Sequence, residues 1–382
     1  MRKVLAALVA VACGIVAGRS AQGAAASCGD VNGDAAVNIT DPVNLLNFLF
    51  LSGPAPECTA DSPSCGNVNG DTLVNLSDAV YLLNWLFLRG PEPVCAGGPQ
   101  VIAGFTFTRI NEQGYPEYTH DQTGITFVLL LGGKFNMGAQ KDDPEAPNYD
   151  PHCAATGEGP VHEVTLSPFL IGKYELTQGQ WKAVMGNYPS YFDGTKDENG
   201  DPVDPPDDRD SLPVETVSWN DIQHFEAETG LWLPTEAQWE YACRAGTDTA
   251  SFFGSGESCA DWTCAACDER DDFMWYCGNS GGGPKSGRTH EVGTKPANAF
   301  GLHDTHGNVW EYCADVWDSE FYSRPEAAGP DPLCTSGSEG VIRRGGGKGA
   351  TASLCRSARR EVSARNDPWL THGFRAAFWP LP

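Results

Sequence analysis

The chain has 382 residues, a formal net charge of -25 at pH 7, and 44 glycines and 27 prolines. A protein this acidic repels phosphate backbones, so no nucleic-acid partner is expected. Its length exceeds that of a usual single core, and we expect two folded parts in a loop-rich globular protein, one larger than the other.

The N-terminus has the pattern of a secretory leader. A basic start at Arg2-Lys3 is followed by an apolar stretch, Val4–Val16, and then by small residues. This pattern predicts a signal peptide over residues 1–26, removed on export to a secreted, cell-surface or periplasmic location. No later stretch approaches the roughly 20 apolar residues that crossing a bilayer takes, so no membrane span is expected. Of the 14 cysteines, Cys13 leaves with the leader, and an odd number enters an oxidising compartment where disulfides persist.

Residues 27–98 contain a duplicated unit. The segment Cys28–Asp34 is matched by Cys65–Asp71, and each copy leads from a polar loop into an apolar run, Leu45–Leu51 or Leu82–Leu88. Each copy therefore predicts a loop followed by an amphipathic helix. Oxygen ligands at every second position of a loop, and again at its end, suit Ca²⁺. The expected ligands are Asp30, Asn32, Asp34, the carbonyl of Ala36 and Asp41 in the first loop, and Asn67, Asn69, Asp71, Leu73 and Asp78 in the second.

The duplicated unit resembles a dockerin type I module, because the last ligand of each loop is aspartate and one helix follows each loop. The resemblance implies a small all-α module that binds Ca²⁺ and a cohesin-like or cell-surface scaffold partner. Ala35 and Thr72 stand where that family usually has glycine, so the backbone must bend there with a side chain present. The alternative is a pair of polar turns without metal. The cysteine spacing indicates one disulfide in each copy, Cys28 to Cys58 and Cys65 to Cys95.

The larger domain is expected over residues 124–382, after a linker and lead strand over residues 99–123. Apolar residues bracketed by glycines predict a strand hairpin over residues 127–138. A pair of strands is expected next, at His162–Leu166 and Phe169–Thr177.

Two helices are expected after these strands. One begins at Gln178, and the other follows Thr235, where Gln238 completes a capping box and Trp239 faces the core. Further short blocks follow at Gly301–Tyr312, Arg344–Gly346, Cys355–Arg359 and Gly373–Arg375.

The order and spacing of these blocks over residues 124–378 resemble the formylglycine-generating-enzyme, or sulfatase-modifying-factor, superfamily. The resemblance implies an α+β, loop-rich, C-type-lectin-like fold with little regular structure and with bound calcium. Matching the family's calcium block to this chain gives carboxylates from Asp304 and Glu311 and carbonyls from Gly307 and Val309. The alternative is that Glu311 caps a turn and Trp310 belongs to the core.

The resemblance also implies where an active site would lie. The family's oxidase uses O₂ to convert a sulfatase cysteine to formylglycine, and it holds Cu⁺ between two cysteines, whose soft thiolates suit that ion. The two positions are Ala350 and Cys355 here, so Cys355 is the remaining candidate catalytic residue, and Cu⁺ is expected only if oxidase activity survives. Gly347 and Lys348 stand where the family often has serine and an aromatic residue.

The cysteines allow a second interpretation. We favour a disulfide from Cys355 to Cys243 or Cys313 over an open thiolate at Cys355. Disulfides are also expected, rather than zinc, in the run Cys259, Cys264, Cys267 and Cys277.

Two functions follow from the sequence. No nucleophile elbow, Walker loop or His-Glu-x-x-His motif is present, so hydrolase functions lack support. One function is an active oxidase that acts on a sulfatase. The other, which the changes at Gly347, Lys348 and Ala350 favour, is a catalytically silent domain that binds a glycan or protein ligand.

Overall fold

The computed structural model describes residues 21–22, 31, 36–51, 78–79, 82–83, 102–153, 157–197, 199–202, 207–254, 264–265, 268–281, 287–337 and 340–379. The chain divides into two compact units, Met1–Val101 and Ile102–Pro382. Within the described residues, none of the helices is both long enough and apolar enough to cross a bilayer.

The first unit contains the helix expected after the first polar loop. Strand β1 (Ala21–Gln22) pairs with β2 (Ala36–Val37), and α2 (Thr40–Leu51) follows. Pro42 lies in the first turn of α2, where a helix needs no N–H donor, and Leu45 is fully buried. Of the second copy, residues 78–79 and 82–83 are described, and they are helical.

The second unit is built on two larger sheets and one strand pair. The five-stranded sheet has the order β13-β8-β5-β4-β3, and the four-stranded sheet has the order β11-β10-β9-β12. The first contains β3 (Phe105–Ile110), β4 (Pro116–His120), β5 (Thr126–Leu130), β8 (Phe169–Gly172) and β13 (Ala377–Phe378). The second contains β9 (Trp310–Val316), β10 (Gly340–Arg344), β11 (Glu361–Ala364) and β12 (His372–Gly373), while β6 (Gly133–Met137) pairs with β7 (His162–Leu166).

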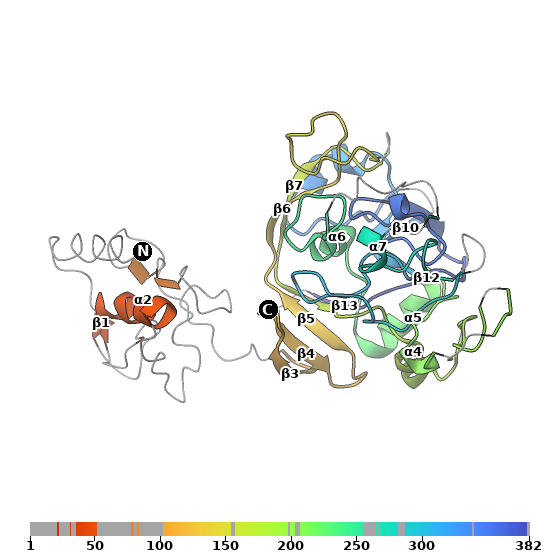
Figure 1. The fold of residues 1–382 in the computed structure, drawn as a ribbon, viewed down its shortest axis with the longest axis horizontal. Coiled ribbons are helices and arrows are strands. Elements are labelled where there is room, and N and C mark those ends of the chain that lie inside the picture. Colours follow the sequence, from red (N-terminus) through yellow and green to blue (C-terminus); the bar gives the residue numbers. More distant parts are fainter. Residues whose placement is uncertain are drawn as a thin grey trace. The chain divides into compact units, whose positions relative to one another are not determined.

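The predicted strands form, but the predicted pairings are wrong. Strand β5 pairs with β4 and β8, and β6 pairs with β7, so neither residues 127–138 nor the next two strands make a hairpin. Gly132 and Gly133 have φ values of 71° and 115°, and a Cβ on Gly132 would lie 2.1 Å from the carbonyl oxygen of Leu166. Glycine therefore lets the chain turn out of one sheet and into another. Figure 1 shows β6 and β7 drawn away from β3 and β4.

The helices begin as the sequence predicts. Thr235 caps α6 (Glu236–Arg244) in a capping box with Gln238, and Trp239 is 1% exposed. A second capping box, at Thr177, begins α4. The remaining helices and 3₁₀ turns are α4 (Gln178–Met185), η1 (Arg209–Ser211), α5 (Trp219–Thr229), α7 (Asp268–Asp271), η2 (Phe321–Ser323), η3 (Pro325–Ala328) and η4 (Ala352–Leu354).

Two apolar cores lie on opposite faces of β5. Phe127 and Leu129 pack into one core with residues of α4 and α5, whereas Val128 and Leu130 pack into another with residues of β7 and α6. Successive side chains of a strand point to opposite faces, so both faces of this strand are covered. The mixture of strands, short helices and long loops agrees with the α+β class.

Candidate functional site

A glycine turn places the segment that carries Cys355. Strand β10 ends at Arg344, and Gly345 and Gly346 follow with φ values of 89° and 76°. A Cβ on Gly346 would lie 2.4 Å from the Sγ of Cys355. The glycine pair therefore allows the thiol to pack directly against the turn.

Cys355 is a buried thiol beside the position of the missing cysteine. Its side chain is 1% exposed, and Ala350 and Trp310 belong to the same apolar cluster. The Sγ of Cys355 donates a hydrogen bond to the carbonyl oxygen of Thr351 at 3.6 Å. Burial raises the pKa of this thiol to about 12, so it is protonated at neutral pH.

The disulfide prediction for Cys355 is wrong. Cys355, Cys243 and Cys313 are free thiols, and the last two lie in a different apolar cluster from Cys355. By contrast, the disulfide prediction for the later run is confirmed at Cys264 and Cys277, which pack in the cluster of Cys355. Cys259 and Cys267 lie outside the described residues, as do Cys28, Cys58, Cys65 and Cys95.

The described residues do not fit a copper centre with two thiolates. Cys355 offers one sulfur, and the other cysteine sulfurs of its cluster, those of Cys264 and Cys277, are consumed by their disulfide. Two-coordinate Cu⁺ needs a second deprotonated sulfur. The methyl group of Ala350 cannot supply it.

The side chain of Lys348 is also buried and does not line an open active site. Its side chain is 1% exposed, and its Nζ donates to the carbonyl oxygen of Gly287 at 2.7 Å and lies 4.7 Å from the centre of the Phe192 ring. Nearby Glu215 is fully buried, and burial raises the pKa of its carboxyl to about 7 despite the lowering effects of hydrogen bonds and of Lys348. The ammonium group is therefore turned into the protein.

Three buried carboxylates, those of Glu175, Asp304 and Glu311, lie close enough to interact electrostatically near the block that contains the predicted calcium ligands. The carboxylate of Glu311 accepts from Arg375 Nε at 2.6 Å and Nη2 at 2.7 Å, and from Trp239 Nε1 at 2.8 Å. Burial raises the pKa of Glu175 well above its usual value, and the charges of Asp304 and Glu311 raise it further. Burial also raises the pKa of Asp304 to about 6. The guanidinium of Arg375 therefore offsets only part of the negative charge here.

The other two predicted calcium ligands of this block, Gly307 and Val309, are fixed in place through their backbone N–H groups. Gly307 donates its N–H to the carbonyl of Gly345 at 2.8 Å, and Val309 donates its N–H to Glu175 at 3.0 Å. A Cβ on Gly307 would lie 2.0 Å from the carbonyl oxygen of Trp275, so only glycine fits. In the part of the chain that the structure describes, no group of three or more His, Cys, Asp and Glu side chains could hold a metal. Excess carboxylate would suit a cation, but calcium here stays a prediction.

The calcium loops of the first unit are described only in part. Asp41 is fully buried, and its carboxylate accepts from the N–H groups of Val31 at 2.8 Å and Asn38 at 2.7 Å. Asp78 is also buried, and Ala36 lies in β2. The other predicted ligands, Asp30, Asn32, Asp34, Asn67, Asn69, Asp71 and Leu73, lie outside the described residues.

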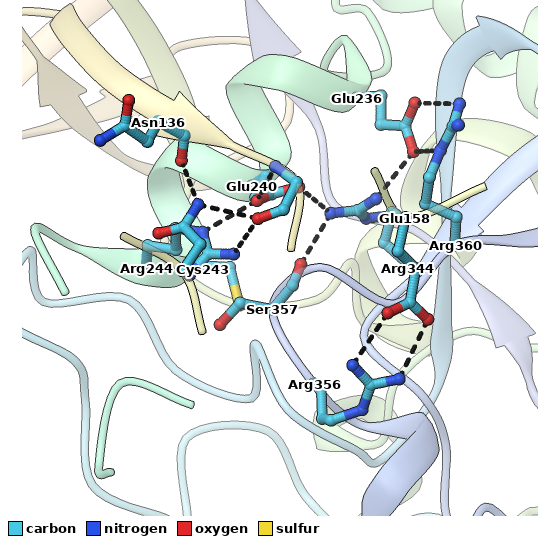
Figure 2. Close-up of polar contacts among 12 residues, drawn as sticks. Asn136, Glu158, Glu236, Glu240, Cys243, Arg244, Arg344, Arg356, Ser357 and Arg360 are labelled. Atoms are coloured by element: carbon cyan, nitrogen blue, oxygen red, sulfur yellow. Dashed lines mark hydrogen bonds and ion pairs between the residues drawn. The ribbon is translucent and has the colours of Figure 1, made fainter. Parts of the chain in front are cut away.

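A second buried charged group is an ion-pair network centred on α6 (Figure 2). Glu236 accepts from Arg344 at 2.8 Å and from Arg360 at 2.7 and 2.8 Å, and Glu240 accepts from Arg244 at 2.8 Å and from Arg344. Arg344 and Glu240 are fully buried. Burial alone would raise the pKa of Glu240, but Arg244 and Arg344 outweigh that effect and lower it. Each carboxylate therefore meets two guanidinium groups.

The sequence interpretation missed Glu175 and this network. Glu175 lies three residues after the end of the apolar strand β8, and a lone acidic residue close to a buried strand was the available signal. The network has no local signal, because Glu236 and Arg344 are 108 positions apart in the sequence.

Two known proteins illustrate what this chain is similar to in sequence. The formylglycine-generating enzyme of Thermomonospora curvata is 30% identical over 327 residues, which cover 70% of this chain and 97% of that protein. The inactive C-alpha-formylglycine-generating enzyme 2 of Bos taurus is 28% identical over 240 residues, covering 51% of this chain and 72% of that protein.

Two solved structures share the fold. Treponema denticola variable protein 1 has a TM-score of 0.51 and 24% identity, covering 73% of this chain and 100% of that chain. PvdO from Pseudomonas aeruginosa has a TM-score of 0.50 and 24% identity, covering 73% and 99%. The profile of the sulfatase-modifying factor enzyme 1-like domain matches residues 112–378. Because that match spans more than half of the chain, the chain belongs to the sulfatase-modifying factor family, which includes the formylglycine-generating enzymes.

Proposed function

We propose that the large domain is a binding member of this family that has lost the copper-dependent oxidase reaction. One observation carries the proposal: Ala350 occupies the first cysteine position, and the second, Cys355, is a buried thiol whose pKa burial raises to about 12. A thiol that is both alone and protonated is a poor ligand for Cu⁺ and a poor nucleophile. The changes at Gly347 and Lys348 support the same function.

A second candidate is an active formylglycine-generating oxidase. It is favoured by the 30% identity to an enzyme of that name, which spans almost the whole of the relative. On this function the substrate is a cysteine of a sulfatase, and Cys355 would have to hold Cu⁺ without its partner.

We also propose that the chain is exported and that its first unit binds Ca²⁺ and a cohesin-like or cell-surface scaffold protein. The basic and apolar start of the chain supports export, and the duplicated loop with Asp41 and Asp78 supports calcium binding. A further Ca²⁺ is proposed at Asp304, where burial and excess negative charge favour a cation. Intact-mass measurement of the exported protein should find residues 1–26 absent.

The oxidase question is tested by a pair of proteins, the natural chain and the variant Ala350→Cys. Both are titrated with Cu⁺ against a chromogenic competing chelator, and both are incubated with O₂, a reductant and a cysteine-containing sulfatase peptide. The natural chain should take no Cu⁺ from the chelator and leave the peptide mass unchanged. Ala350→Cys restores the second sulfur and should compete for Cu⁺, because paired thiolates suit that ion. Aldehyde formation in the peptide by the natural chain would overturn the proposal in favour of the oxidase.

A further inference from the structure

A hollow of about 290 Å³ lies on the four-stranded sheet, and Cys355 is not among the residues that line it. That volume is near the lower end of the range for small-molecule sites, roughly 300–1,000 Å³. The residues that matter for its chemistry are Arg343, Ser363, Asp367, Trp369, Thr371 and His372. They come from β10, β11, β12 and the loop between the last two strands.

Arg343 brings to the hollow a positive charge that no direct ion pair meets among the described residues, although the carboxylate of Glu361 acts on it from the neighbouring strand. Its guanidinium donates a hydrogen bond to His372 and lies 4.7 Å from the centre of the Trp310 ring. Within the described ranges it forms no ion pair, because the nearby carboxylate of Glu361 pairs with Arg359. The Nε of Arg343 has no hydrogen-bond partner there, but it is buried and faces away from solvent. Among the described residues Nη1 donates to His372, and Nη2 has no partner and is not buried. A planar guanidinium with an unused, accessible donor group is a strong site for a carboxylate or sulfate.

His372 holds this guanidinium without adding charge. Burial and the charge of Arg343 lower the pKa of His372 to about 2, so its ring is neutral at physiological pH. Its Nε2 accepts from Arg343, which leaves the proton on Nδ1, and Nδ1 lies 3.0 Å from the hydroxyl of Tyr312. That hydroxyl donates in turn to the carbonyl of Asp367 at 3.0 Å. The chain of hydrogen bonds fixes Arg343 relative to the loop.

Trp369 forms an apolar wall of the same hollow. Its side chain is 58% exposed, the most of any large apolar residue that the structure describes, and lining residue Val362 is 45% exposed. The carbonyl of Trp369 accepts from the N–H groups of Thr216 and His372, both at 3.0 Å. An exposed indole on a backbone fixed at two points presents a flat apolar face at a low entropic cost.

We propose that this hollow binds a sugar ring that carries an anionic group, either a carboxylate or a sulfate. The anion pairs with Arg343, and the C–H face of the ring stacks on Trp369. Ser363 and Asp367 lie in reach of the ring hydroxyls. A chain with a net charge of -25 repels free anions, so binding at this place depends on Arg343. The inference rests on the proposed binding role and names its ligand class.

The test measures intrinsic tryptophan fluorescence and calorimetric heat as the full chain is titrated with four probes: glucuronic acid, glucose 6-sulfate, glucose and acetate. At least one of the two anionic sugars should bind saturably. Tighter binding of glucuronic acid would identify a carboxylate as the preferred anion, and tighter binding of glucose 6-sulfate would identify a sulfate. Glucose and acetate should bind at least about tenfold more weakly, because each lacks one of the two contacts, and a hydrogen bond to a charged group is worth about that much.

Three variants locate the binding. Arg343→Gln should weaken the anionic sugar at least about tenfold, and Trp369→Ala should weaken binding and remove most of the fluorescence change. Trp232→Ala is the matched control, because Trp232 is 49% exposed and does not line the hollow. It should leave binding unchanged.

Three results would overturn the inference: no saturable response to either anionic sugar, equal binding of acetate, or unaltered binding by Arg343→Gln with an unchanged melting temperature. None of these depends on copper or aldehyde formation, so a failed sugar titration is distinguishable from a surviving oxidase activity.

Discussion

The large domain contains two groups of buried carboxylates, and they differ in how much positive charge lies beside them. Around α6, Glu236 and Glu240 each meet two guanidinium groups. Behind β8, the carboxylates of Glu175, Asp304 and Glu311 share one guanidinium, that of Arg375, which pairs directly only with Glu311. In the first group every carboxylate is directly paired, with three guanidinium groups for two carboxylates. The second group is unbalanced, because it carries surplus negative charge.

The difference shows that burial alone does not decide whether a charged group needs a proton or a cation from solution. Both groups are removed from water, where an unpaired charge costs several kcal/mol. The paired α6 group needs no cation from outside the chain and is structural. The unbalanced group is stabilised by anything that brings positive charge, either a proton or a cation. Its stability should therefore depend on solution conditions, whereas that of the α6 network should not.

The largest expected effect comes from breaking the paired α6 network. Arg344→Met removes a fully buried guanidinium that bonds to both Glu236 and Glu240 and leaves each carboxylate with one guanidinium. Because a hydrogen bond to a charged group is worth about 1.5–3 kcal/mol, we expect a loss of about 3–5 kcal/mol in the free energy of unfolding, measured by urea denaturation. Addition of Ca²⁺ should not recover it. A loss below about 1 kcal/mol, the size typical of exposed pairs, would mean that Arg344 does not join the two carboxylates as described.

Calcium should stabilise the unbalanced group. At a free concentration of about 100 times its dissociation constant, Ca²⁺ bound only to the folded state adds about 2.7 kcal/mol, which scanning calorimetry would detect as a higher melting temperature. Asp304→Asn should remove the part of this rise in melting temperature that comes from Ca²⁺ bound to the large domain. Asp41→Asn should remove the part that comes from Ca²⁺ bound to the first unit. If the melting temperature is the same with Ca²⁺ and with a chelator, the surplus charge is met by protons instead.

Glu215 extends the comparison to a single buried carboxyl without an ion pair among the described residues. Its pKa rises from 4.5 unfolded to about 7 folded, so the folded state binds a proton more tightly. Stability from this group is fully present below the unfolded pKa and is lost as the pH rises through about 7. Glu215→Gln mimics the protonated form, so it should be close to neutral at pH 5 and stabilising at pH 8.5. A difference between the two proteins that does not vary with pH would contradict the raised pKa.

The smallest effect is expected at the surface. Lys134 and Glu163 form an ion pair at 2.6 Å, but their side chains are 67% and 59% exposed. Lys134→Ala should cost about 0–1 kcal/mol in urea denaturation, and less at high salt. A larger cost would show that exposure is a poor guide to the strength of ion pairs in this protein.

Local signals in the sequence predicted local structure well. The capping box at Thr235 and the buried Trp239 follow from residues a few positions apart, and the strands follow from apolar runs. Strand partners were predicted wrongly, because pairing depends on where a glycine turn sends the chain and not on which runs are adjacent. The resemblance of the large domain to the sulfatase-modifying-factor superfamily is confirmed by the match over residues 112–378. The dockerin-like resemblance of the first unit stays a prediction.

Contacts between distant segments could not be predicted in the same way. The sequence predicts a disulfide from Cys355 to Cys243 or Cys313, but the structure places Cys355 in a cluster apart from those two cysteines. The partners of Glu236 and the hollow beside Arg343 likewise depend on segments that meet only in the folded chain. Metal ligands in the loops of the first unit stay predictions.

The pairing of β13 with β8 makes completion of the five-stranded sheet a late step in folding. Ala377 pairs with Ile171 and Phe378 with Leu170, so each contact closes a loop of about 200 residues. The pairing of β3 with β4 is local by comparison and should form sooner, because contacts distant in sequence form slowly. Until β13 docks, one edge of β8 has unpaired backbone groups, and a variant that lacks Ala377 and Phe378 should keep that edge open to pairing with another chain.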